Sequence, residues 1–207
     1  MGNQIYTIGR EFGSGGYTVA KLLAERLGVK LYDKELLTQA AKESGFCEEI
    51  FVNHDEKPTS SFLYSLVMDT YSGGGYSSAA FLGMPINQKV FLAQFDTIKK
   101  IAEQEPCVIV GRCADYALAD NPDCMNIFIR AQKADRIRRV SARESVTESK
   151  AKDMIQKSDK QRASYYNYYT SKKWGDSTSY DLCLNTSRIE PADCVDVILE
   201  FRKHLKV

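Results

Sequence analysis

The stretch YTIGREFGSGGYTVAKLLAERLG, at residues 6–28, constrains the fold more than any other part of the chain. A short β-rich run ends in glycine, and apolar residues with helical spacing follow from Tyr17 to Leu27. A strand that enters a helix through a glycine-rich turn leaves several backbone N–H groups unpaired at the positive end of the helix dipole. Such a turn is typical of a phosphate site, because small residues let the anion approach the backbone closely.

The predicted phosphate site consists of six consecutive residues: Gly13, Ser14, Gly15, Gly16, Tyr17 and Thr18. The hydroxyl groups of Ser14 and Thr18 are expected to reach a phosphate or a Mg²⁺ ion. The pattern G-x-x-x-x-G-K-[ST] is not satisfied, since its first position falls on Arg10 and its lysine on Gly16. The alternative is a glycine-rich turn between a strand and a helix that binds no ligand.

The rest of the chain alternates between patterns typical of strands and of helices. Strands are predicted at 4–9, 29–33, 107–111, 125–131 and 180–186, and helices at 17–27, 34–43, 87–104, 134–145 and from Pro191 to about His204. Strands separated by helices indicate a parallel sheet that is covered on both faces. We therefore predict an α/β fold, and the length of 207 residues suits a single domain.

Two stretches interrupt this alternation, at residues 44–86 and 147–179. The first contains DTYSGGGYSSAAFLGMP, and the second contains SDKQRASYYNYYTSKKWGDSTS. We interpret both as mobile elements over the edge of the active site. For the first stretch, a plain flexible surface loop is the alternative, because a Gly-Ser tract is evidence of composition only.

The charge and cysteine content exclude several classes of partner. Lys and Arg total 28 against 27 Asp and Glu, so the net charge of +1 favours neither a nucleic-acid surface nor a membrane surface. No apolar run approaches the roughly 20 residues that span a bilayer, and no leader pattern opens the chain, so we expect a cytoplasmic protein. The six cysteines form no C-x-x-C pair; buried thiols are expected and no metal site.

The order of several segments resembles the cytidylate-kinase-like branch of the P-loop nucleoside monophosphate kinases. The segments are IGREFGSGGYTVAKLLAERLGVKLYD, VIVGRCADYAL, IFIRAQKADRIRR, SDKQRASYYNYY and YDLCLNTSRI. The resemblance implies a three-layer α/β/α kinase fold with a five-stranded parallel sheet, a helical substrate-binding insert at 44–86 and a lid at 147–179. It also implies ATP and Mg²⁺, with a small nucleotide as the substrate.

Three site residues follow from this resemblance. Arg112, in GRC, matches the family arginine that contacts the phosphate of the acceptor; the alternative is an arginine that caps a helix or pairs with a carboxylate. Asp159 and Arg162 keep the D-x-x-R spacing of the lid. Arg162 is then a clamp on the transferred phosphate, and Asp159 orients it or contacts a ribose hydroxyl. A solvated ion pair along the helix is the alternative.

The chain also departs from the family pattern. The loop lysine is Gly16, the aspartate that helps to read cytosine is Cys113, and two arginines are replaced by Ile155 and Gln39. These departures leave the base specificity open.

Arg10 is the nearest cation to replace the loop lysine, since a guanidinium binds phosphate oxygens through two parallel bonds. Its alternative is a pair with Glu11 or another carboxylate, which leaves Mg²⁺ and Arg162 as the main positive charge. For the two missing acceptor-side arginines, Lys34, Lys157, Lys160 and Arg10 are the nearby candidates. If Arg10 is the substitute, Gly16→Lys is expected to restore part of the activity of Arg10→Ala, provided that the lysine fits.

Two further clusters have more than one interpretation. The four tyrosines of YYNYY, at 165–169, suit a base-stacking surface or a homodimer contact; the alternative is core packing of two of them with Trp174. The basic run KADRIRR, at 133–139, is interpreted as a solvated helix face, although the family resemblance places it near the adenine end of ATP.

Taken together, the residues and the resemblance predict an ATP-dependent phosphotransferase acting on a nucleoside monophosphate or a related small phosphate acceptor. The second hypothesis is a nucleotide-binding sensor with weak catalysis. The third is an interaction protein that retains only the glycine turn.

Overall fold

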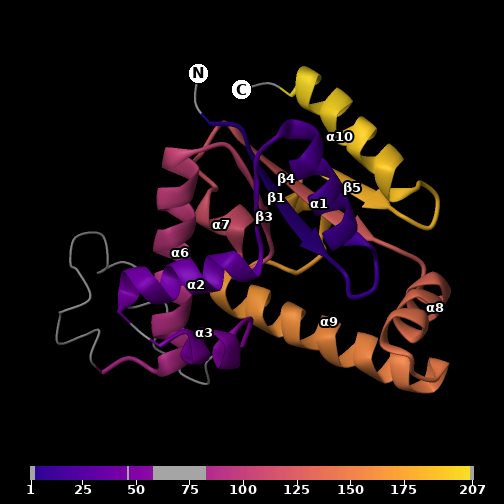
Figure 1. Ribbon diagram of the computed structural model, residues 1–207, viewed down its shortest axis with the longest axis horizontal. Helices are drawn as coiled ribbons and strands as arrows, with labels where there is room; N and C mark the ends of the chain where they lie inside the picture. Colours follow the sequence, from indigo (N-terminus) through magenta and orange to yellow (C-terminus); the bar gives the residue numbers. More distant parts are fainter. Residues whose placement is uncertain (1–2, 46, 58–82, 206–207) are drawn as a thin grey trace.

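The computed structural model describes residues 3–45, 47–57 and 83–205, and it has an α/β architecture (Figure 1). Most of the Gly-Ser-rich tract at 69–85 therefore lies outside the described residues. The five strands are β1 (Ile5–Arg10), β2 (Lys30–Tyr32), β3 (Cys107–Val110), β4 (Cys124–Arg130) and β5 (Leu182–Asn185). They form one parallel sheet in the order β2-β3-β1-β4-β5. The predicted five-stranded parallel sheet is confirmed.

The described helices connect and cover these strands. They are α1 (Gly16–Leu27), α2 (Lys34–Ser44), α3 (Glu48–His54), α6 (Ile86–Gln104), α7 (Ala114–Ala117), α8 (Lys133–Glu144), α9 (Glu148–Thr170) and α10 (Pro191–His204), with a 3₁₀ turn η1 (Ser177–Ser179). The helix predicted to start at Pro191 is confirmed, since α10 begins there. Proline fits the first turn, where no backbone donor is needed.

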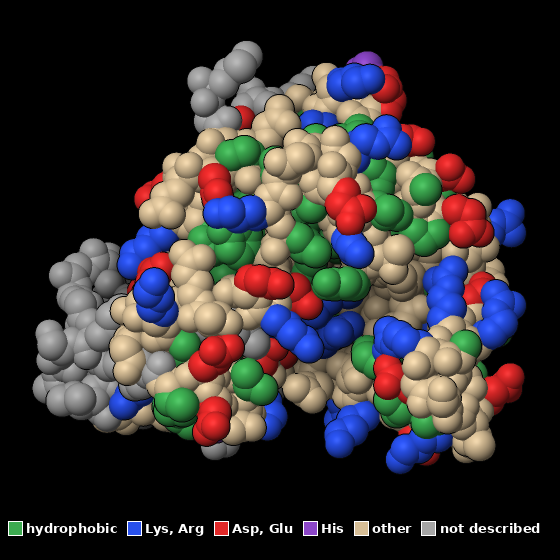
Figure 2. Space-filling model, in the orientation of Figure 1, with side chains coloured by type: hydrophobic (Ala, Val, Ile, Leu, Met, Phe, Trp, Pro, Cys, Tyr) green, Lys and Arg blue, Asp and Glu red, His purple; other side chains and the backbone are tan. Residues whose placement is uncertain are grey.

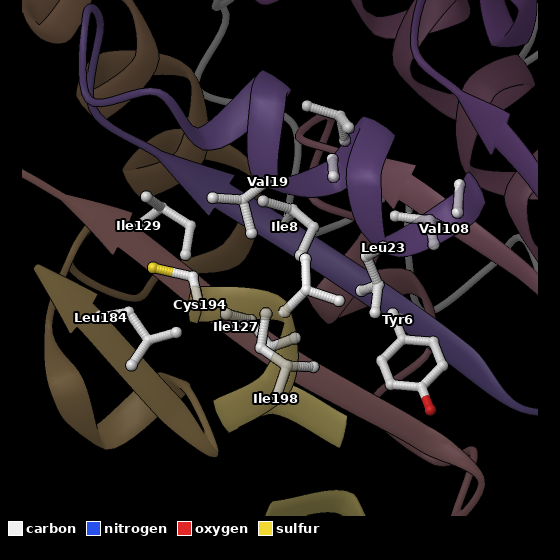
Figure 3. Packing of buried hydrophobic residues seen from close by; sticks show 14 of the residues in the cluster. Tyr6, Ile8, Val19, Leu23, Val108, Ile127, Ile129, Leu184, Cys194 and Ile198 are labelled. Atoms are coloured by element: carbon white, nitrogen blue, oxygen red, sulfur yellow. The ribbon is translucent and has the colours of Figure 1, made fainter. Parts of the chain in front are cut away.

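Alternate residues of the central strands enter two different cores. Tyr6, Ile8 and Val108 pack against α1 and α10, as Figure 3 shows with Val19, Leu23 and Ile198. Their sequence neighbours, such as Ile5 and Ile109, pack on the opposite face against α6 and α7. Because side chains of a strand point alternately to the two faces, a strand in the middle of three layers is apolar throughout. The fold is thus the three-layer arrangement that was predicted.

The second interrupting stretch is largely one long helix, α9. Thr147 caps its first turn, since its hydroxyl accepts a hydrogen bond from the backbone N–H of Lys150 at 3.3 Å. Near its other end Tyr165, Tyr166 and Tyr169 are buried, and the ring of Tyr169 stacks on that of Phe91 with centroids 3.9 Å apart. The core-packing interpretation, made for two of the tyrosines with Trp174, is confirmed and extends to a third, with Trp174 packed against the same cluster.

The cysteines divide into two groups. Cys107, Cys113, Cys124 and Cys194 are buried free thiols, as predicted, whereas Cys47 and Cys183 are exposed, contrary to the prediction. Burial raises the pKa of Cys107 and of Cys124 to about 12. Within the described residues, no cluster of His, Cys, Asp and Glu is suited to a metal ion, and no helix is long and apolar enough to cross a membrane.

Candidate active site

Two adjoining cavities lie at the carboxyl end of the sheet, where ligands of open α/β sheets bind. The loop cavity, of about 510 Å³, is lined by residues that include Gly13, Gly15, Gly16, Tyr17, Thr18 and Arg143. The α3 cavity, of about 390 Å³, is lined by residues that include Glu48, Asp55, Glu56 and Arg112. Both cavities share Arg10, Asp33, Lys34 and Arg162. Figure 2 shows basic side chains gathered beside a hollow between α2 and α8.

The turn from β1 to α1, residues 11–18, is called the glycine loop here. Gly13 has a φ of +77°, and a Cβ there would lie 2.7 Å from Cγ2 of Val140, so the position requires glycine. The N–H of Gly16 is bonded to Ser14 Oγ at 3.3 Å. The N–H groups of Tyr17 and Thr18 have no acceptor among the residues that the structure describes. Backbone donors are therefore available at the start of α1, as the sequence predicted.

Ser14 departs from its predicted role. Its side chain is fully buried and does not line the loop cavity. Its carbonyl oxygen accepts hydrogen bonds from Arg139 Nη1 at 3.1 Å and from Thr186 Oγ1 at 2.5 Å. The hydroxyl itself accepts the N–H of Gly16 within the loop, away from the loop cavity. Thr18 and Tyr17 do line the cavity.

The side chain of Arg10 leaves no room for a side chain at position 16. A Cβ on Gly16 would lie 2.5 Å from Cβ of Arg10 and 3.3 Å from Cβ of Ile129. A lysine at position 16 therefore collides with the root of the Arg10 side chain, which even Arg10→Ala retains. The condition attached to Gly16→Lys, that the side chain fits, is therefore not met on this backbone.

Arg10 and Arg162 share one carboxylate. Arg10 Nη1 donates to Glu56 Oε1 at 2.8 Å, and Arg162 Nε lies 3.3 Å from Glu56 Oε2. Arg162 Nη1 also donates to the carbonyl oxygen of Arg10 at 3.1 Å. Desolvation and the nearby charge of Arg10 lower the pKa of Arg162 to about 10, so it stays charged at neutral pH. The two guanidinium groups outweigh burial and hold the pKa of Glu56 below its usual value.

Arg112 is held between two aspartates. Its Nε and Nη2 donate to the two oxygens of Asp55 at 3.0 and 2.9 Å, and its Nη1 donates to Asp33 Oδ1 at 3.0 Å. Only 4% of Arg112 is exposed, and its φ is +54°. Burial raises the pKa of Asp55, while the surrounding carboxylates raise that of Arg112. Arg112 thus pairs with carboxylates here and also lines the α3 cavity.

Asp159 and Arg162 lie one turn apart on α9, as their spacing predicted, but they have different partners. Asp159 Oδ1 accepts a hydrogen bond from the N–H of Phe12 at 2.9 Å, and its other oxygen pairs with Arg136. Arg136 is 6% exposed, so the interpretation of 133–139 as a solvated face is wrong for this residue. It holds for Arg138, whose side chain is 76% exposed.

The other residues named from the sequence are less central. Lys34 lines both cavities, whereas Lys157 and Lys160 are exposed and line neither. Ile155 belongs to a small apolar core with Val140 and Ala151. Gln39 donates to Glu43 at 2.9 Å.

The surroundings of position 113 are unsuited to reading a base edge. Cys113 is 3% exposed and packs in an aromatic cluster with Tyr165 and Tyr169. Nearby Asp115 accepts a hydrogen bond from the hydroxyl of Tyr166 at 2.6 Å. The carboxylate two residues beyond Cys113 is thus already engaged within the protein.

Sequence reasoning missed three residues of the site, Asp33, Asp55 and Glu56, and it assigned a fourth, Arg136, to a solvated helix face. Asp33 directly follows β2, and a polar residue at the end of a parallel strand is a signal that would have found it. Asp55 and Glu56 follow α3 within the weakest part of the family resemblance, and no local pattern marks them.

Comparison with known proteins places these features in a family. The family model described as the cytidylate kinase-like family matches residues 5–188. A cytidylate kinase from Sulfolobus acidocaldarius is 24% identical over 187 residues, covering 90% of this chain and 87% of that protein.

Two solved structures are similar over nearly the whole chain. An uncharacterized protein from Eubacterium ventriosum ATCC 27560 is 34% identical, with a TM-score of 0.73 and coverage of 97% of this chain and 99% of its own. A shikimate kinase from Bacteroides thetaiotaomicron shares the fold, with 15% identity, a TM-score of 0.54 and coverage of 96% and 98%. The fold is that of the P-loop kinases, and the chain belongs to the cytidylate kinase-like family.

Proposed function

We propose that this chain is an ATP-dependent phosphotransferase whose acceptor is a small molecule bearing a phosphate, such as a nucleoside monophosphate. The observation that carries the proposal is the position of Arg10 and Arg162 on the wall shared by the two cavities. A donor phosphate in the loop cavity and an acceptor in the α3 cavity would meet beside these two arginines.

The loop cavity is the proposed donor site. Backbone N–H groups at the start of a helix bind phosphate without any lysine. Mg²⁺ prefers oxygen ligands and commonly uses one or two carboxylates together with substrate phosphates; Thr18 and Asp33 supply such oxygens here. Together with the phosphates of the nucleotide, these two oxygens would hold the ion, which when bound would neutralise phosphate charge.

The α3 cavity is the proposed acceptor site. Arg112 binds a carboxylate through two parallel hydrogen bonds, the same geometry with which arginine binds phosphate. The carboxylates of Asp55 and Glu56 stand where an acceptor's anionic group would bind, so the acceptor must exchange with them. With Cys113 buried, recognition rests on the anion more than on the base.

Phosphoryl transfer needs positive charge on the oxygens of the moving group and protection from water. Arg10 and Arg162 would supply that charge between the two sites. Their guanidinium groups are pre-positioned by Glu56, and both side chains are mostly buried, at 12% and 17% exposed. Residues 147–179 would close over the donor side, whereas most of the predicted insert at 44–86 lies outside the described residues.

A second candidate function is nucleotide binding with weak catalysis. Two observations favour it. The loop has no lysine, and Glu56 and Asp55 form ion pairs with Arg10, Arg162 and Arg112. Such a protein would bind ATP and report its presence by a change in conformation.

The deciding experiment is a turnover assay with ATP, Mg²⁺ and a panel of acceptors. The panel contains the nucleoside monophosphates, phosphorylated sugars, and hydroxy acids that carry a carboxylate but no phosphate. ADP formation that depends on one phosphate-bearing acceptor supports the proposal. Stabilisation by ATP in thermal unfolding with no turnover of any acceptor supports the second candidate, and turnover of hydroxy acids alone contradicts the proposed acceptor class.

A further inference from the structure

We infer that Asp159 of α9 and Arg136 of α8 are positioning residues that hold the glycine loop in its anion-binding shape. The inference rests on the proposed function in one respect only, namely that the loop binds the phosphates of ATP. It gives Asp159 a role different from the one expected from the family spacing, which was to orient Arg162 or contact a ribose.

Both backbone polar groups of Phe12 are held by these two side chains. The N–H of Phe12 donates to Asp159 Oδ1 at 2.9 Å, and its carbonyl oxygen accepts from Arg136 Nε at 2.8 Å. Arg136 and Asp159 also pair with each other. Since Phe12 directly precedes Gly13, fixing its peptide groups fixes the entrance of the loop.

Glu11 ties the same junction to the sheet. Arg136 Nη1 lies 3.2 Å from Glu11 Oε1, while Glu11 Oε2 accepts a hydrogen bond from the N–H of Ala131 at 2.9 Å, just beyond β4. The backbone of Arg136 also lies against the loop, because a Cβ on Gly13 would be 3.1 Å from the Arg136 carbonyl oxygen. Charge-assisted bonds of this kind, largely buried, are strong and directional.

The network links the lid helix to both ligand sites. Through Asp159, α9 holds the N–H of Phe12, and through Arg162 Nη1 it holds the carbonyl oxygen of Arg10. One turn of α9 therefore contacts the backbone on both sides of Glu11. The position of this turn sets the shape of the donor loop and the place of the Arg162 guanidinium together.

The test uses Asp159→Ala and Arg136→Met, with Asp153→Ala and Arg138→Met as matched controls. Both control residues are exposed on the same two helices and contact neither the loop nor a cavity in the described structure. Two quantities are measured: the Kd of ATP by calorimetry, and the amide hydrogen exchange of residues 12–18 without ligand. We expect Asp159→Ala to weaken ATP binding by about tenfold or more and to speed exchange in the loop, because a charge-assisted bond is lost.

A conservative variant separates positioning from general stability. Asp159→Asn keeps an oxygen that can accept the N–H of Phe12 but loses the charge, so its ATP affinity should lie between those of wild type and Asp159→Ala. Unchanged loop exchange and ATP affinity in Asp159→Ala, with a raised KM for the acceptor, would overturn the inference. If the wild-type protein binds no ATP, the proposed function fails, while the exchange measurement still decides whether Asp159 and Arg136 hold the loop.

Discussion

The loop cavity and the α3 cavity attract anions by opposite means. In the loop cavity the donors are backbone N–H groups, fixed by glycines and left without an acceptor among the described residues. In the α3 cavity they are arginine side chains, and the protein's own carboxylates already engage Arg10, Arg112 and Arg162. One site is preformed and open, whereas the other is satisfied internally.

This difference has an energetic meaning. Backbone donors at a helix start cost little to leave exposed to water, but buried guanidinium groups need a counter-charge in the absence of ligand. Asp55 and Glu56 provide it. The proposed acceptor must therefore compete with two carboxylates, while a donor phosphate at the backbone N–H groups of the loop competes only with water.

Replacing Arg10 should have the largest effect, because it removes the charge between the two sites. Arg10→Ala is expected to lower kcat by about a thousandfold, since positive charge on a transferring phosphoryl group is worth that much in related chemistry. The measurement is steady-state turnover with the acceptor identified from the panel. Turnover within threefold of wild type would remove Arg10 from the mechanism.

The double variant Arg10→Ala with Gly16→Lys is the control for that experiment. Because Cβ of residue 10 blocks a side chain at position 16, the lysine should restore no activity and should lower the melting temperature further. Restored turnover would mean that the loop backbone can shift to accept it.

Arg112→Lys should have the next largest effect, and it should be confined to the acceptor. A lysine keeps the charge but cannot form the two parallel bonds, so the KM of the acceptor should rise on the order of a hundredfold, with the KM of ATP unchanged. The free energy of unfolding should fall as well, because Asp55 and Asp33 lose hydrogen bonds from the guanidinium group. Equal increases in both KM values would contradict the assignment of the α3 cavity to the acceptor.

Glu56→Gln should act in the opposite direction on binding. Removing the competing charge frees Arg10 and Arg162, so the acceptor should bind about tenfold more tightly while the free energy of unfolding falls by about 2 kcal/mol. Glu48→Gln is the matched control, since Glu48 lines the same cavity and bonds to Thr38. Weaker acceptor binding in Glu56→Gln would show that Glu56 assists the acceptor instead.

The smallest expected effect is a pH dependence of the difference in unfolding free energy between wild type and Glu56→Gln. The pKa of Glu56 is lowered in the folded protein, from an ordinary value of 4.5. Its stabilisation is therefore fully present above about pH 4.5 and is lost as the pH falls through the folded-state value. Urea unfolding of wild type and Glu56→Gln should give a constant difference above that pH and a shrinking one below it.

The sequence predicts the residues of the loop cavity far better than those of the α3 cavity. The glycine loop is a local pattern, so residues 13–18 and the strand and helix around them were predictable from one short stretch. The five strands were likewise predictable, because buried parallel strands are continuous apolar runs.

The partners within the α3 cavity could not be predicted, because they come together only through the fold. Glu56 is distant in sequence from both Arg10 and Arg162, and no spacing rule connects them. Likewise Asp159 and Arg162, the two residues of the D-x-x-R pattern, bind different partners, because Asp159 pairs with Arg136. Local spacing predicted that they share a side of α9, and tertiary contacts decided what each one binds.

The stacked rings of Phe91 and Tyr169 anchor one end of α9 to α6. Arg162 stands seven residues from Tyr169, about 10 Å along the axis, whereas Glu148 stands about 30 Å away. A swing of about 10° around the stack would carry the far tip about 5 Å but Arg162 only about 2 Å. If α9 turns about this stack, a wide displacement near Glu148 becomes a small displacement at Arg162.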